Sequence, residues 1–128
     1  MSKRVRQGDA NTGLTMHEMS LCEGILQVLE QNATEQGYSK VKTVWLEIGE
    51  LSGVEIEAMR FGFDAVMKNT LADGARLEII PLPGQAWCMQ CAKNVHVKQR
   101  FDECPDCGSY QLQVTGGDEM RIKELEVA

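Results

Sequence analysis

Four of the five cysteines have the type and spacing of metal ligands. They form two C-x2-C pairs, Cys88 with Cys91 and Cys104 with Cys107, separated by twelve residues within a window of twenty. Four thiolates complete a tetrahedral zinc site, and this spacing is close to that of zinc-binding pairs. Gly108 tolerates the backbone turn that closes the second pair. Two disulfides, a redox C-x-x-C pair and an iron–sulfur cluster are the alternatives; the spacing favours a structural Zn²⁺.

A second group of polar residues lies near two predicted helix starts. His17 and Glu18 are adjacent at the first, and Glu50, Glu55 and Glu57 surround the second. Imidazole and backbone nitrogens suit Ni(II) or Cu(II), and a carboxylate oxygen can complete such a set. The ordinary alternative is that the carboxylates stabilise helix N-termini while His17 is solvated. Spacing alone leaves both interpretations open.

Bulk properties exclude several classes of function. Residues 1–15 carry a charge of +2 and the rest carries −8, which argues against a nucleic-acid partner because phosphate binding needs Lys and Arg. No apolar run is long enough to span a membrane, and no export signal precedes the odd number of cysteines, which indicates a cytoplasmic protein. No nucleophile or phosphate-loop motif occurs, and four thiolates leave zinc no open position. We therefore expect no enzymatic activity.

Hydrophobic periodicity predicts where the elements lie. Residues 16–37 and about 56–69 have helical spacing, and Gly37 would end the first helix. Residues 41–48, 77–79, 111–114 and 120–127 have the pattern of strands, with Pro81 and Pro83 ending the second. The prediction is an α+β fold, with two helices packed on a small, mostly antiparallel sheet and an inserted zinc-ribbon-like module.

These elements suggest three parts of the chain. Residues 1–15 are polar and aperiodic, and we interpret them as a disordered extension, with Met16 a candidate for the true start. Residues 16–85 with 110–128 would form the α+β domain, and residues 86–109 the zinc module. The module has few large aliphatic residues, so metal binding would supply much of its folding free energy.

Three motifs in order give the chain a specific resemblance. Met16-His17-Glu18, the segment WLEIGELSGVE at 45–55 and the double C-x2-C make it resemble the hydrogenase nickel-incorporation proteins of the HypA/HybF family, from Met16 to the C-terminus. The resemblance implies a nickel metallochaperone that helps insert Ni(II) into the [NiFe] hydrogenase large subunit. A nickel domain of two helices and a three-stranded sheet would carry the zinc module.

The same resemblance implies ligands and partners. The labile Ni²⁺ ligands would be His17, with Glu18 and Glu55, and the structural Zn²⁺ would be bound by Cys88, Cys91, Cys104 and Cys107. A nickel-linked maturation GTPase (HypB-like) and the hydrogenase large-subunit precursor would be the partners of a monomer or weak homodimer. In the family the amino group of the methionine lies beside the site, and here fifteen residues precede it. The rival reading is a zinc-ribbon adaptor that binds a protein partner and no nickel.

Overall fold

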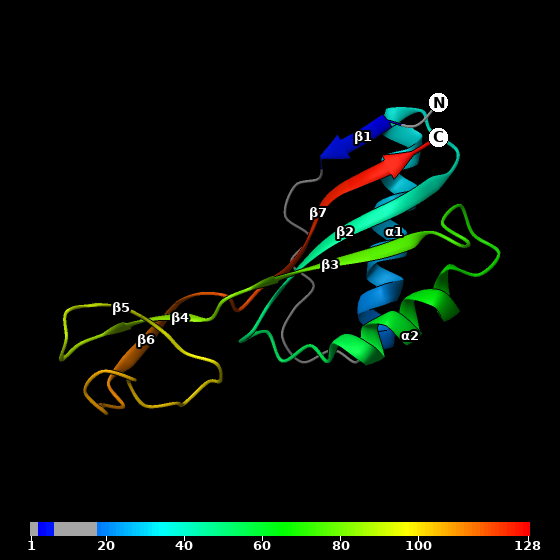
Figure 1. The fold of residues 1–128 in the computed structure, drawn as a ribbon. Coiled ribbons are helices and arrows are strands. Elements are labelled where there is room, and N and C mark those ends of the chain that lie inside the picture. The colour runs from blue at the N-terminus through cyan, green and yellow to red at the C-terminus, as the bar shows by residue number, and fades with distance from the viewer. Residues whose placement is uncertain (1–2, 7–17) are drawn as a thin grey trace.

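The computed structural model describes residues 3–6 and 18–128, which form two sheets and two helices (Figure 1). A larger sheet has the strand order β1-β7-β2-β3, and a smaller one the order β5-β4-β6. Both helices cover one face of the larger sheet, and the smaller sheet extends from one of its ends. The elements are β1 (Lys3–Arg6), α1 (Glu18–Gln36), β2 (Val41–Gly49), α2 (Ile56–Met67), β3 (Arg76–Leu82), β4 (Gln85–Cys88), β5 (Lys93–His96), β6 (Leu112–Gly116) and β7 (Met120–Val127).

The main core lies between the helices and the larger sheet. β2 is its central strand: it pairs parallel to β3, through the α2 crossover, and antiparallel to β7. Leu29 on α1, Leu46 on β2 and Phe63 on α2 are each at most 1% exposed. Fully burying side chains of this size stabilises the fold by about 1.5–3 kcal/mol each. The predicted α+β class, with two helices on a mostly antiparallel sheet, is confirmed.

The helices end and meet as their sequences require. Gly37 takes a φ of +76°, and its N–H donates to the carbonyl of Ala33 at 2.9 Å, which ends α1 as predicted. Gly62 lets α2 approach α1 closely, because a Cβ there would lie 3.3 Å from the Sγ of Cys22. Cys22 is fully buried, and burial first of all raises the pKa of its thiol to about 11. Its role is packing, as expected of a lone core cysteine.

Three parts of the fold differ from the expectations. Lys3–Arg6 forms β1, so this part of the presumed disordered extension is a strand paired with β7; residues 1–2 and 7–15 lie outside the described residues. β6 pairs with β4, so it belongs to the smaller sheet, which is therefore wider than the expected 86–109 module. β3 continues through Pro81 to Leu82. An edge strand tolerates a proline because one of its sides has no strand partner.

Candidate metal centre

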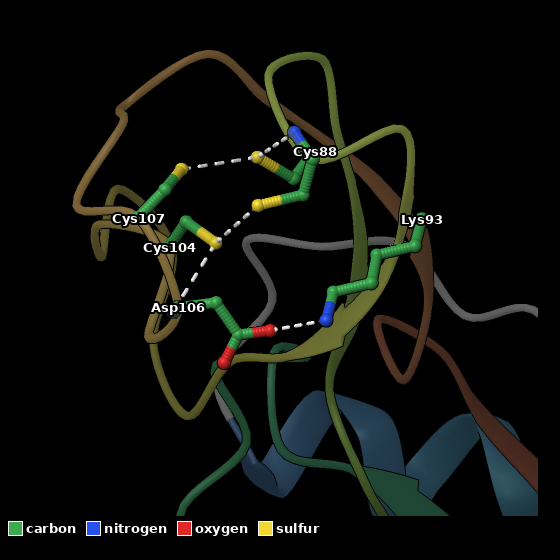
Figure 2. A network of polar contacts seen from close by, with 6 residues as sticks. Cys88, Lys93, Cys104, Asp106 and Cys107 are labelled. Atoms are coloured by element: carbon green, nitrogen blue, oxygen red, sulfur yellow. Dashed lines mark hydrogen bonds and ion pairs between the residues drawn. The ribbon is translucent and has the colours of Figure 1, made fainter.

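The smaller sheet carries the four cysteines on two knuckles of matching geometry (Figure 2). In each knuckle, the residue after the second cysteine donates its N–H to the carbonyl of the first: Ala92 to Cys88 at 2.8 Å and Gly108 to Cys104 at 2.9 Å. Both donors have a positive φ, +54° at Ala92 and +77° at Gly108. This conformation turns the chain back so that the paired sulfurs face the other knuckle.

The sulfur positions fit a single tetrahedral ion. The Sγ atoms of Cys88 and Cys107 lie 3.6 Å apart, those of Cys91 and Cys104 lie 3.9 Å apart, and all four are within 4.8 Å of one another. Four sulfurs bound to one zinc at about 2.3 Å would be about 3.8 Å apart. No cysteine is in a disulfide. Among the described residues this is the only group of three or more possible ligands close enough to share an ion.

Backbone amides and one ion pair support the thiolates. The N–H of Cys91 lies 3.3 Å from the Sγ of Cys88, and the N–H of Asp106 lies 3.4 Å from the Sγ of Cys104. Lys93, on β5 beyond the first knuckle, pairs with Asp106 of the second at 2.6 Å, so it ties the knuckles together (Figure 2). Its ammonium also offsets the negative charge of a tetrathiolate site.

The thiols respond unequally to this environment. The Cys91 N–H, which is the largest influence, helps lower the pKa of Cys88 to about 7, so one thiolate forms readily at neutral pH. The neighbouring sulfurs, with Cys107 first, and burial raise the pKa of Cys91 to about 12. Four adjacent thiols cannot all lose their protons without a cation, because each negative charge opposes the next. A divalent metal supplies that charge.

The segment 49–53, between β2 and α2, joins the two sheets. Leu51 is 3% exposed and packs in the core of the cysteine module with Ala86, Cys88, Val95, Val97 and Cys104. Glu50 accepts a hydrogen bond from the N–H of Gly84 at 2.9 Å and lies 2.7 Å from the Nε2 of His96. These two contacts hold the pKa of the Glu50 carboxyl below its ordinary value of 4.5.

Three glycines permit this junction. A Cβ at Gly49 would lie 2.1 Å from the carbonyl oxygen of Gly117, one at Gly84 would lie 2.3 Å from that of Val97, and one at Gly117 would lie 2.3 Å from that of Pro83. Only residues without a side chain allow backbones to approach so closely. From the sequence, Glu50 was placed in an acidic cluster, and Leu51, whose partners are distant in the chain, was not identified.

Two of the three predicted nickel ligands lie together where α1 and α2 begin. The backbone N–H of Glu55 donates to a carboxylate oxygen of Glu18 at 3.4 Å. The side chain of Glu55 caps α2 by accepting from the N–H of Ala58 at 3.1 Å. His17 lies outside the described residues, but it is the chain neighbour of Glu18. The helix-capping alternative therefore holds for Glu55, and a carboxylate that uses one oxygen for a cap retains another for an ion.

Together, a four-thiolate module and a small α+β domain with carboxylates at two helix starts define a metal-handling protein. A model of the family described as hydrogenase/urease nickel incorporation, metallochaperone, hypA matches residues 16–127, and the chain belongs to this family. Hydrogenase maturation factor HypA from Alkalilimnicola ehrlichii is 69% identical over 112 residues, which are 88% of this chain and 99% of the relative. The factor of the same name from Rhodopseudomonas palustris is 63% identical over 112 residues, with the same coverage of both chains.

Solved structures agree with this assignment. The solution structure of the Ni metallochaperone HypA from Helicobacter pylori has a TM-score of 0.64 at 25% identity, and covers 88% of this chain and 97% of that one. The resemblance found in the sequence is therefore confirmed. None of the helices in the described ranges has the length and apolar character needed to cross a bilayer.

Proposed function

We propose that this protein is a nickel metallochaperone that binds Ni(II) at His17, Glu18 and Glu55 and helps insert it into the [NiFe] hydrogenase large subunit. The contact between the backbone N–H of Glu55 and the carboxylate of Glu18 is the observation that carries this proposal, because it places Glu55, from a distant part of the chain, beside Glu18, the chain neighbour of His17. One imidazole nitrogen, carboxylate oxygens and backbone nitrogen suit Ni(II). The membership in a nickel-incorporation family supports the same ion.

In this proposal the two metals have different roles. Zinc is the resident ion of Cys88, Cys91, Cys104 and Cys107, where four thiolates leave no position for exchange. Nickel is the cargo, and two of its proposed ligands, Glu18 and the exposed Glu55, lie at helix starts where an acceptor could replace them one at a time. A carrier needs this openness, because it must release the ion to a better-shaped site. The recipients would be a nickel-linked maturation GTPase and the hydrogenase precursor.

The chain contains two histidines, which gives the test its own control. His17→Ala should abolish stoichiometric nickel binding in calorimetric titrations of the zinc-loaded protein. His96→Ala should leave nickel binding unchanged, because His96 contacts Glu50 at the junction. If the titrations gave the opposite pattern, or if neither variant lost nickel, the assignment of His17 would be wrong. Zinc content should stay constant in both variants.

Glu55→Gln separates the nickel role from the cap. The amide oxygen of Gln can still accept from the N–H of Ala58, so the stability of α2 should change little. The loss of negative charge should weaken nickel binding by about tenfold or more, because charged ligands bind a divalent ion much more strongly than neutral ones. Unchanged affinity would assign Glu55 to the cap alone and would remove it from the ligand set.

A further inference from the structure

The side of β7 that faces away from β2 pairs with β1, a strand from the N-terminal end of the chain. β1 pairs antiparallel with β7, with Lys3 opposite Val127, Arg4 opposite Glu126, Val5 opposite Leu125 and Arg6 opposite Glu124. On its other side β7 pairs with β2, so β1 is the outermost strand of the sheet here. Without β1, the backbone groups of β7 would form a sheet edge able to accept another strand.

The register gives this edge a defined chemical preference. Leu125 is fully buried on the face toward the helices, while Glu124 and Glu126 alternate with it and are half-buried. Residues directly opposite each other in an antiparallel pair share a face, and opposite charges there are favourable. β1 supplies a cationic, an apolar and a cationic residue at 4, 5 and 6 against the acidic, apolar and acidic residues at 126, 125 and 124. The edge therefore matches an extended basic segment.

β1 lies outside the region that this chain shares with its relatives. The family model begins at residue 16, and the 112 matched residues are 99% of the Alkalilimnicola ehrlichii relative. β1 precedes that matched region. The matched sequence of this relative therefore has no counterpart of β1.

Among the described residues, β1 pairs with only part of this edge. It pairs with four residues of β7, 124–127, while β7 runs through eight, 120–127. A longer strand could form more backbone hydrogen bonds than β1 does. Against this, β1 is part of the same chain, and a tethered segment can have an effective concentration on the order of millimolar. A partner must therefore compete with an internal strand.

We propose that the β7 edge is a strand-addition site for an extended segment of a partner protein with a cationic-apolar-cationic pattern, and that residues 3–6 block this site in the same chain. The recognition combines backbone hydrogen bonds along β7 with charge pairing to Glu124 and Glu126. It is independent of nickel and zinc, and so of the proposed metallochaperone function.

The test is a titration of a peptide into protein in which β1 covers the β7 edge (wild type) and into variants in which β1 is released or absent. The probe is the eight-residue peptide MSKRVRQG, and the readouts are its affinity and the amide NMR shifts of β7. In Arg4→Glu/Arg6→Glu, acidic residues would take the register positions opposite Glu126 and Glu124, which should release β1. The peptide should bind this variant, and a chain that starts at Met16, at least about tenfold more tightly than wild type.

Matched controls identify the cause of any difference. Lys68→Glu/Lys98→Glu makes the same change of charge at two exposed positions away from β7, and should bind the peptide as weakly as wild type. The peptide MSEEVEQG should bind none of the proteins. The proposal is overturned if the opened chains do not bind MSKRVRQG, if all chains bind it equally, or if the opened chains instead pair with one another as dimers in sedimentation experiments.

Discussion

Ala92 and Gly108 hold equivalent positions in the two cysteine knuckles, yet only one of them has the residue that this position favours. Both donate to the carbonyl of the first cysteine of their pair, and both have a positive φ. An L-residue with a side chain is strained in this conformation, whereas glycine is not. Ala92 therefore stores strain beside the metal site, which the rest of the knuckle compensates.

Ala92→Gly should stabilise the zinc-loaded module by about 0.5–1 kcal/mol, because relief of the strained φ outweighs the greater freedom of glycine in the unfolded chain. Denaturant unfolding followed at the module would measure it. Gly108→Ala is the reciprocal variant and should be destabilising by a similar amount, since the nearest atom to its Cβ would be at 3.6 Å and space is not limiting. A neutral or unfavourable Ala92→Gly would show that the knuckle has adapted to alanine.

At the scale of elements, the segment between β2 and α2 contacts both the cysteine module and one of the proposed nickel ligands. Its first residues, Glu50 and Leu51, contact the cysteine module, and its last residue, Glu55, caps α2 and contacts Glu18. Ser52 fixes the turn between them by donating its hydroxyl to the carbonyl of Gly49 at 2.7 Å. One short connection therefore positions the module and a proposed nickel ligand.

Leu51→Ala should loosen the module from the larger sheet. Leu51 is 3% exposed, and removing a buried leucine side chain costs about 2–5 kcal/mol. Hydrogen exchange should become faster at Val95 and Val97 while Leu46 in the main core keeps its protection. Met89→Ala is the control, because Met89 lies in the same module and is 61% exposed. Equal exchange in wild type and Leu51→Ala would mean that the junction hydrogen bonds alone hold the module.

Sequence patterns predicted the elements whose signals are local. The cysteine spacing located the group of four sulfurs that could hold a metal ion, and helical periodicity with Gly37 located α1. The pairings of β1 and β6 could not be obtained in this way, because they depend on which sheet edge lies nearby after folding. Leu51 was missed for the same reason: its partners lie more than thirty residues further along the chain. The basic pattern at 4–6 and the acidic pattern at 124–126 were visible but were not compared.

At the scale of the whole molecule, the two cores are separate. Among the residues that the structure describes, nineteen buried ones form the core under the helices, and a smaller cluster around Cys88 and Cys104 forms the other. The second cluster has few large aliphatic side chains, so a bound metal must contribute much of its stability. The larger core has no such need.

Removal of zinc by a chelator should therefore unfold the module and spare the domain. Amide NMR signals of β4, β5 and β6 should lose their dispersion, while those of β2, β3 and β7 should persist. Added zinc should restore the first set. Collapse of both sets would show that the domain depends on the module, and survival of both would show that the module folds without metal.

The position of the module in the strand order has a practical consequence for protein engineering. β3 leads into the module and β7 returns from it, and they flank β2 at the same end of the larger sheet, where Gly49 lies opposite Leu82 and Ile48 opposite Met120. Two strands on either side of a third are about 10 Å apart, a gap that about four residues can bridge. A designer could delete the segment from 83 to 119 and splice in such a linker, and the remaining chain would keep every strand of its sheet. The cysteine module could thus be exchanged for another binding domain whose termini lie close together, joined at the same two points.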